Sequence, residues 1–401
     1  MGNTPTAASA QNEPSSLLDA ALNGELDRVK KQVGIFLATN NNNNNSNYEP
    51  SNDVKPVPDP RLVAFVDAQD ANGNAAIHGA AFGGHVDVMQ FLHSSCGASL
   101  ELKNNLGCSP LWLAAGYNRP QVFTYVWQQL RKRNDSSATA SEENRNGLQL
   151  PLLTTNSTGD SILLAAASRG HTDMVQTILQ AANATTSSTL KCQANRSGDT
   201  PLNVAMAGDF HTDDKLMNLL MDASIVHRTN EKGVSPILMA CERDWSLLLE
   251  RLLELHQSKE REPTPANVVV GGADAASPST PPTTTTTTTQ PTFQSLLGMA
   301  AFCGSDNVMS MLINRQRLQQ QDDAPLSFPE QLNQANSSDG ATPLWLAARA
   351  GHTACVKLLL EAGADTTIAN RKGITPFAIA IIHKRVDIIN LLQPHTPEPQ
   401  M

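Results

Sequence analysis

The sequence predicts an all-α solenoid, in which stacked helix-turn-helix repeats are joined by β-hairpin-like loops and interrupted by disordered insertions. Three observations predict this fold class. Marker glycines recur at intervals of 33 to 52 residues within two series, Gly73 to Gly233 and Gly340 to Gly373, each shortly before the start of a helix. Hydrophobic residues make up 40% of the 401 residues but aromatic residues only 4%, so small aliphatic side chains must supply the core. Polar low-complexity tracts separate the periodic segments.

The order of segments follows from composition and periodicity. Residues 1–14 predict a disordered N-terminus, and residues 15–37 predict a pair of helices that caps the array. Residues 38–60 contain a run of asparagines and several prolines and are expected to form a linker. The repeat array is predicted over residues 61–393, and residues 394–401 form a disordered tail.

The clearest repeat runs from Asn336 to Asp365. After Gly340 it reads Thr-Pro-Leu, then an Ala-Ala pair, Gly-His, a run of leucines and Gly-Ala-Asp, and the next marker glycine, Gly373, follows 33 residues after Gly340. Degraded copies follow five earlier glycines, and one more, around residues 295–304, lacks the leading Gly and Pro. The five glycines are Gly73, Gly107, Gly159, Gly198 and Gly233.

In period and in motif order, this series closely resembles the ankyrin repeat family. The resemblance covers most of residues 15–393 and implies about eight repeats besides the leading helix pair.

Each residue type that recurs in the motif also has a physical role of its own. Ser or Thr before Pro caps a helix N-terminus, and a small Ala-Ala face lets neighbouring helices approach. An Asx residue three positions before a marker glycine can bond the local backbone and form a turn; these are Asp70, Asn104, Asn156, Asn195, Asn230 and Asn370.

Extra length between repeats is expected in polar inserts at about residues 131–155, 182–193, 257–291 and 314–336. Such segments bury too little apolar surface to offset the entropy of ordering the chain. The insert at 257–291 is the longest and contains seven consecutive threonines. The sequence leaves open whether this insert divides the array into two parts.

Charge and motif content argue against catalysis and nucleic-acid binding. The net charge is −9, the six cysteines are widely scattered, and no pattern matches a metal site, a phosphate loop or a nucleophile elbow. We therefore predict a non-enzymatic protein without cofactors or bound metal. Histidines that recur at repeat positions are predicted to be structural; they are His78, His85, His171 and His352. Reduced thiols and the lack of a long apolar run favour a cytoplasmic location, with nuclear or peripheral membrane locations as alternatives.

The family resemblance implies a protein partner bound along the concave face, formed by hairpin tips and the ends of the first helices. The resemblance implies that residues that follow each Ala-Ala pair face this groove. Several are aromatic or arginine residues, which are frequent interface anchors, so we expect these positions to contact the partner. They are Phe82, Tyr117, Arg169, Glu242, Arg243, Phe302 and Arg349. Among the tip residues, Asn72, Leu106 and Arg196 are expected to contact the edges of the partner. The predicted function is that of a monomeric scaffold or adaptor.

Two short motifs offer alternative functions. The opening Met1-Gly2-Asn3-Thr4-Pro5-Thr6 fits N-myristoylation of Gly2, and a single acyl chain would support weak membrane association. Residues 61–65, Arg-Leu-Val-Ala-Phe, resemble the docking peptide of protein phosphatase 1 regulators. That resemblance would make the chain a targeting subunit. Residues 63–70 also align with the hairpin before a repeat, where the side chains of Val63 and Phe65 would pack inward.

Overall fold

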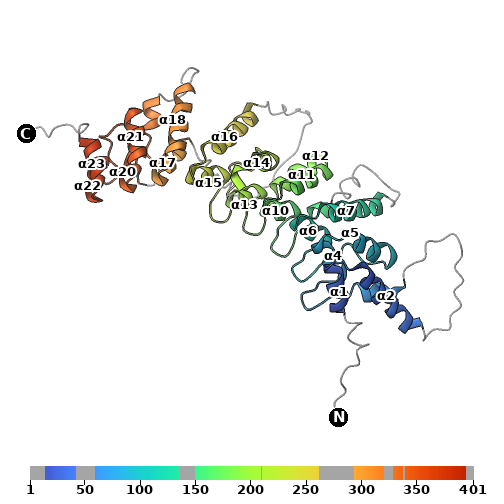
Figure 1. Cartoon of the computed structure of the whole chain (residues 1–401). Coiled ribbons are helices and arrows are strands. Elements are labelled where there is room, and N and C mark those ends of the chain that lie inside the picture. The colour runs from blue at the N-terminus through green and yellow to red at the C-terminus, as the bar shows by residue number, and fades with distance from the viewer. Residues whose placement is uncertain are drawn as a thin grey trace, which may run out of the picture. The chain divides into compact units, whose positions relative to one another are not determined.

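The computed structural model describes residues 14–41, 59–135, 150–208, 210–261, 293–319, 328–336 and 339–393. The chain forms two compact units, Met1–Asp222 and Ala223–Met401, called unit 1 and unit 2 below. Both are built from helix pairs, as predicted (Figure 1). Within the described ranges there is no β-strand, and one isolated bridge joins Thr155 to Ser161.

Unit 1 contains five helix pairs in its described part. These are α1 (Pro14–Leu22) with α2 (Leu26–Asn41), α4 (Ala76–Gly83) with α5 (Val86–Gln90) and the π-helical turn η1 (Phe91–Ser95), α6 (Pro110–Gly116) with α7 (Pro120–Asp135), α10 (Ile162–Ala167) with α11 (Thr172–Ala181), and α13 (Pro201–Ala207) with α14 (Asp214–Leu220). Shorter elements lie between the pairs: α3 (Pro60–Val66), α9 (Leu150–Leu153), α12 (Ala184–Cys192) and the 3-10 turn η2 (Phe210–Thr212).

Unit 2 contains four helix pairs in its described part. These are α15 (Pro236–Glu242) with α16 (Ser246–Arg261), α17 (Phe293–Cys303) with α18 (Asp306–Gln319), α20 (Pro343–Ala350) with α21 (Thr353–Glu361), and α22 (Pro376–Ile382) with α23 (Val386–Leu392). The short helix α19 (Phe328–Leu332) precedes α20. Because α15 packs on α17 and α16 on α18, the long insert between α16 and α17 lies inside unit 2 and does not mark the division of the chain.

The first helix of most repeats begins at a side-chain cap. A Ser or Thr hydroxyl accepts a hydrogen bond from the backbone N–H three residues later, which satisfies a donor that the helix itself leaves without a partner. The capping residues are Ser109, Ser161, Thr200, Ser235, Thr342 and Thr375. The predicted N-caps are therefore confirmed.

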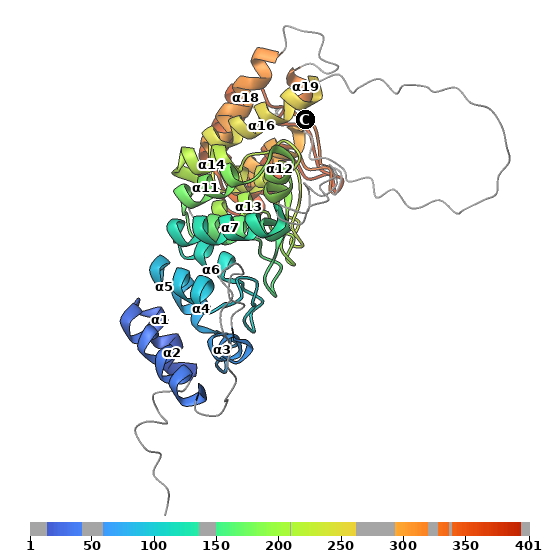
Figure 2. The same cartoon turned by 90° about the vertical axis from the view of Figure 1, so that its right-hand side faces the viewer.

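The loops before these helices are tight turns held by the predicted Asx residues. In the first of them, Asp70 Oδ1 accepts hydrogen bonds from the amides of Asn72 and Asn74 at 2.9 and 2.7 Å. The Asx side chains of the other five turns accept the same two bonds. Neighbouring turns are also joined, since the amide of Asn105 donates to Asn72 O at 3.0 Å. These bonds place the loop tips of unit 1 on one side of its helices (Figures 1 and 2).

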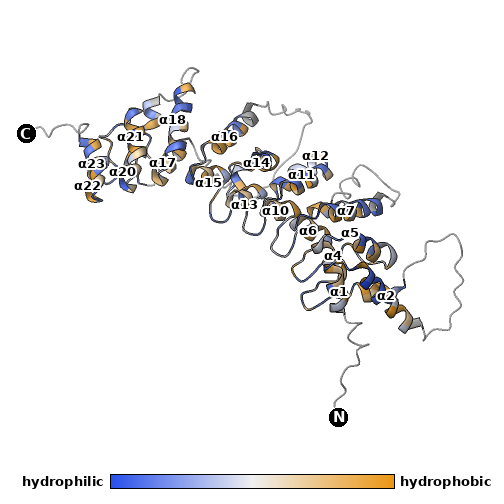
Figure 3. Cartoon of the chain, in the orientation of Figure 1, coloured by the Kyte–Doolittle hydropathy of each residue, from blue (hydrophilic) through white to orange (hydrophobic). Residues whose placement is uncertain are grey.

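The core of each unit lies between its stacked helices. The Ala-Ala pairs are fully buried, among them Ala114 with Ala115 and Ala347 with Ala348, where a larger side chain would hold adjacent helices apart. Figure 3 shows α6 and α10 mainly in the hydrophobic colour, whereas the second helix α7 carries both hydrophobic and hydrophilic faces. Each repeat thus depends on its neighbours for burial, as expected of a solenoid.

Histidine and arginine side chains join consecutive repeats at the ends of the first helices. His85 Nε2 lies 3.0 Å from Leu22 O, and His352 Nε2 lies 3.0 Å from Phe302 O. Arg119 Nε donates to Phe82 O at 2.9 Å, so arginine takes the same place in another repeat. These contacts satisfy carbonyl groups at helix C-termini, and they confirm that His85 and His352 have a structural role.

Substitution of the turn glycine Gly304 is expected to destabilise the fold, because this residue lies against His352. Its φ is +81°, and an added Cβ would lie 2.4 Å from His352 Nδ1. Gly363 has a similar φ of +93° but open space around it, so it provides a matched control. We expect Gly363→Ala to lower the free energy of unfolding by about 1 kcal/mol through backbone strain, and Gly304→Ala by about 1–2 kcal/mol more. Urea unfolding of the full chain measures both.

A double variant tests the cause of the larger effect. In a His352→Ala background, Gly304→Ala should cost no more than Gly363→Ala, because the ring that it would strike is absent. Equal losses from the two glycine variants in the natural background would show that the His352 contact does not matter.

Two expectations about local structure were wrong. Residues 63–66, the first part of the expected hairpin, belong to α3. This helix begins with a proline in its first turn and an Asp59 cap, and it buries Leu62 and Val66. Residues 182–193, expected as an insert, contain α12, whose N-terminus is capped by Asn183 and which buries Leu190. In both segments, burial of a few apolar side chains and an N-cap stabilise a helix, although the surrounding sequence is polar or rich in proline.

Helices also extend into the ends of several predicted inserts. Helix α2 continues to Asn41, α7 to Asp135, α16 to Arg261 and α18 to Gln319. The inserts predicted at 131–155 and 314–336 also contain the short helices α9 and α19. Other parts of the predicted disordered segments lie outside the described residues. They are residues 1–13, 42–58, 136–149, 262–292, 320–327 and 394–401.

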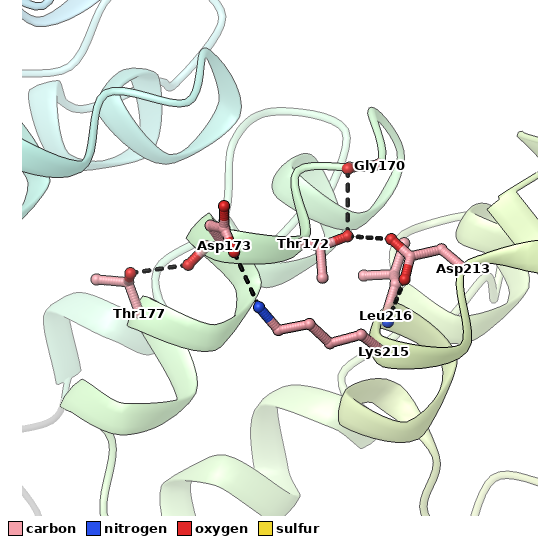
Figure 4. A network of polar contacts seen from close by, with 7 residues as sticks. All are labelled: Gly170, Thr172, Asp173, Thr177, Asp213, Lys215 and Leu216. Atoms are coloured by element: carbon pink, nitrogen blue, oxygen red, sulfur yellow. Dashed lines mark hydrogen bonds and ion pairs between the residues drawn. The ribbon is translucent and has the colours of Figure 1, made fainter.

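A polar network holds the last repeat of unit 1, where Asp209-Phe210 replaces the usual Gly-His (Figure 4). The Thr172 hydroxyl on α11 is hydrogen-bonded to Asp213, the N-cap of α14, and this bond lowers the pKa of the Asp213 carboxyl. Lys215 Nζ forms an ion pair of 2.9 Å with Asp173. These contacts join α11 to α14, although the standard histidine is missing.

Candidate partner-binding groove

A groove of about 610 Å³ runs along unit 1, between the ends of three first helices and the tips of three turns. We call it the unit 1 groove. Helices α1, α4 and α6 form one wall, and the turns around residues 70–74, 104–108 and 156–160 form the other. Its apolar lining includes Leu18, Leu22, Phe82, Leu106, Leu113 and Tyr117. Such a lining can bury apolar side chains of a ligand.

Three of the predicted partner-binding residues meet in this groove. The rings of Phe82 and Tyr117 lie 4.2 Å apart between centroids and are tilted by 51°. The guanidinium of Arg169 lies 4.9 Å from the centre of the Tyr117 ring, and its Nη1 donates to Ala165 O at 3.2 Å. Phe82 is 39% exposed. The side chains come from three consecutive repeats, so stacking creates a continuous aromatic and cationic surface.

His78 lies in the wall of the groove and is nearly completely buried. Its Nδ1 accepts a hydrogen bond from the amide of Ala75 at 3.1 Å, so Nε2 carries the proton and donates to Leu102 O at 3.0 Å. The ring therefore satisfies the backbone amide of Ala75, the N-cap residue of α4, which has no hydroxyl of its own. Burial lowers the pKa of His78, despite opposing hydrogen bonds to Leu102 and Cys108 and the charge of Asp70.

We expect the free energy of unfolding of unit 1 to decrease in acid, because the His78 ring binds a proton more readily in the unfolded chain. Its pKa is lower in the folded than in the unfolded chain, where it is about 6.5, so the unfolded chain binds more protons just below that pH. Stability should therefore be lost as the pH falls through about 6.5. In His78→Gln, the decrease in unfolding free energy between pH 8 and pH 5 should be smaller. Urea unfolding at both values measures it, and His352→Gln in unit 2 is the control.

An equal pH dependence in the natural chain and in His78→Gln would contradict this prediction. It would mean that the buried ring does not oppose proton uptake.

Acidic side chains outnumber basic ones along the groove. Asp19, Asp70 and Asp160 line it, against Arg169 alone among the lysines and arginines of its lining. Asp160 accepts hydrogen bonds from Thr158 and from Asn195, the latter at 3.0 Å. Asp19 is exposed on α1. The groove thus combines an apolar floor with negative charge.

The predicted residues of unit 2 lie on three successive repeats. Glu242 and Arg243 are exposed at the end of α15, where the Arg243 guanidinium lies 5.4 Å from the Trp245 ring centre. Phe302 is 52% exposed at the end of α17. The guanidinium of Arg349 lies 5.6 Å from the ring of Trp345 within α20. Each of the two arginines therefore stacks on a tryptophan of its own repeat.

Sequence reasoning missed the contribution of the capping pair. Leu18, Asp19 and Leu22 of α1 line the groove, although residues 15–37 were expected only to cover the end of the array. The signal was present, since the Leu-Leu-Asp-Ala-Ala sequence of α1 matches the first helix of a repeat. Among the tip residues, Leu106 was expected at the groove and lines it, 65% exposed.

The cysteines are free, and most are buried. Burial raises the pKa of Cys96, Cys108 and Cys355 to about 11 and that of Cys241 to about 12. These thiols therefore stay protonated near neutral pH and pack as small apolar side chains. Across the described part of the chain, no three His, Cys, Asp or Glu side chains are grouped so that they could hold a metal ion.

The motifs that suggested other functions are placed as follows. Arg61–Phe65 lie within α3, where the Phe65 ring stacks on Phe36 at 4.3 Å and Val63 is half-buried. Docking through Phe65 would require this stack to open. Gly2 lies outside the described residues. Among the helices that the structure describes, none combines the length and the hydropathy needed to cross a bilayer.

Comparison with known proteins decides the family. A protein-family model described as "Ankyrin repeat" matches residues 72–105, and one described as "Ankyrin repeats (3 copies)" matches residues 297–401. The chain is an ankyrin repeat protein. The two matched segments lie in different units, so ankyrin repeats occur in both. Ankyrin repeats generally mediate protein–protein interactions, and these models match no catalytic domain in the chain.

No curated protein matches this ankyrin repeat protein. Among the solved structures, it is similar to an ankyrin repeat domain from Acinetobacter baumannii, with 19% sequence identity and a TM-score of 0.41. The alignment covers 61% of this chain and 98% of that domain.

Proposed function

We propose that this ankyrin repeat protein is a non-enzymatic adaptor that binds a protein partner in the unit 1 groove. The observation that carries the proposal is the contact between Phe82 and Tyr117, with Arg169 stacked above Tyr117. Partly exposed aromatic and arginine side chains in a groove are typical anchors of protein interfaces. Here they line a groove that is large enough to bury several side chains of a partner.

Affinity capture from native cells, with quantitative mass spectrometry, tests the proposal. The full chain is compared with the double variant Phe82→Asp/Tyr117→Asp and with Phe302→Asp in unit 2. We expect the double variant to lose the captured partner and Phe302→Asp to retain it, because the two substitutions introduce charge into the groove and Phe302 lies outside it. Circular dichroism establishes that each variant is folded.

Capture that survives in a folded double variant would exclude the unit 1 groove. Loss of the partner only in Phe302→Asp would place the binding site in unit 2, where Glu242, Arg243 and Arg349 are the remaining predicted contacts.

A further inference from the structure

We infer that the unit 1 groove takes an extended segment of a partner protein, in which lysine or arginine side chains lie next to an apolar side chain. This inference rests on the proposed function and adds the chemistry of the partner. Asp19, Asp70 and Asp160 contribute three negative charges to the lining, and Arg169 contributes one positive charge. His78 is neutral, because its Nδ1 accepts a hydrogen bond.

Arg169 is already engaged within the protein. Its Nη1 donates to Ala165 O at 3.2 Å, and its guanidinium covers the Tyr117 ring at 4.9 Å. An acidic partner would therefore meet one cation that already has two contacts, next to three carboxylates. The local field favours a cationic partner instead.

Two of the carboxylates are open to such a partner. Asp19 is exposed on α1, and no ion pair within the described residues neutralises it. Asp70 uses Oδ1 for the amides of Asn72 and Asn74, which leaves Oδ2 for an incoming ammonium or guanidinium. Asp160 is less open, because its two oxygens already accept bonds from Thr158 and Asn195.

The shape of the groove favours an extended peptide. Its helical wall consists of α1, α4 and α6, and packed helices lie about 8–10 Å apart, so this wall is about 20 Å long. A chain that rises about 3.3 Å per residue spans that length with about six residues. Within this length an apolar side chain reaches Phe82 and Tyr117, while basic side chains reach Asp19 and Asp70, which belong to the first helix and the first turn of the groove.

Selection of random twelve-residue peptides on the full chain tests the inference. We expect the selected peptides to be enriched in Lys or Arg next to Leu, Ile, Met or Phe. The dissociation constant of a synthesised selected peptide is then measured against Asp19→Asn/Asp70→Asn. Asparagine occupies the position of Asp70 in five other turns, so this change removes charge and keeps the turn. Binding should weaken about fivefold or more, and the salt dependence should decrease.

A charge-matched control separates local from overall charge. The variant Asp27→Asn/Asp87→Asn removes two exposed carboxylates from α2 and α5, outside the groove, and should bind as the natural chain does. If the selected peptides are acidic or uncharged, or if Asp19→Asn/Asp70→Asn binds them unchanged, the inference is wrong. The proposed function then still stands, provided that Phe82→Asp/Tyr117→Asp abolishes binding. If no selected peptide depends on Phe82 and Tyr117, both are wrong.

Discussion

Replacement of Tyr117 by alanine is expected to weaken binding of the partner about 30-fold to 1000-fold. Truncation of an aromatic anchor at the centre of an interface costs about 2–4 kcal/mol, which corresponds to this range. Tyr117 should show a large effect because its ring contacts both Phe82 and Arg169. Its loss therefore removes its own contact with the partner and releases the side chain of Arg169.

The measurement is calorimetric titration of the captured partner into the full chain and its variants. Tyr117→Phe retains the ring and should bind within about threefold of the natural chain. Tyr125→Ala removes a ring on α7 that contacts His93 outside the groove, and it should leave the affinity unchanged. Equal losses from Tyr117→Ala and Tyr125→Ala would indicate general destabilisation and would contradict a specific role.

Replacement of Phe123 by alanine is expected to have the largest effect on stability. Phe123 lies on α7, which packs against α5 and α6, and its side chain is completely buried. Removal of a buried phenylalanine side chain leaves a cavity and typically costs about 3–5 kcal/mol. Because each repeat contacts mainly its neighbours, the loss should be greatest in α5, α6 and α7 and small in unit 2.

Hydrogen exchange measured by mass spectrometry of the full chain locates the effect. Gln128→Ala, at an exposed position of the same helix, should leave exchange unchanged. Uniformly faster exchange in both units of Phe123→Ala would show that the chain unfolds as one cooperative system. Unchanged exchange would mean that the site repacks without a cavity.

The helix starts and the turns could be predicted because they depend on neighbouring residues. Thr342 caps α20 through an amide three residues away, and Asn370 holds its turn through amides two and four residues away. These contacts require only the right residue at the right offset. A pattern of single residues is therefore enough to place them.

Helices α3 and α12 could not be predicted by the same reasoning. Each is a short segment in polar or proline-rich surroundings, and its own composition does not favour helix. Burial of Leu62 and Val66 in α3, and of Leu190 in α12, stabilises them. The surfaces that cover these side chains come from other parts of unit 1, so the stabilising contact cannot be read from the local sequence.

At the candidate site, too, the sequence identifies single residues, whereas the contacts between them are known only from the structure. Phe82, Tyr117 and Arg169 could be selected individually, because each follows the Ala pair of its repeat. Their mutual contact could not, and neither could the presence of Asp19 and Asp70 in one groove. The capping pair also contributes Leu18 and Leu22, which completes the wall of the groove.

By itself, the sequence determined the ankyrin repeat family, the helix pairs, their caps and the turns between them. Only the tertiary structure decided that the helices α15 to α18 share one unit, that the buried ring of His78 accepts a bond from the amide of Ala75, and that an acidic, aromatic groove forms in unit 1. The physical reason is distance along the chain. Caps and turns close within a few residues, whereas the groove joins residues on repeats whose marker glycines are 34 and 52 residues apart, and packing between repeats sets their separation.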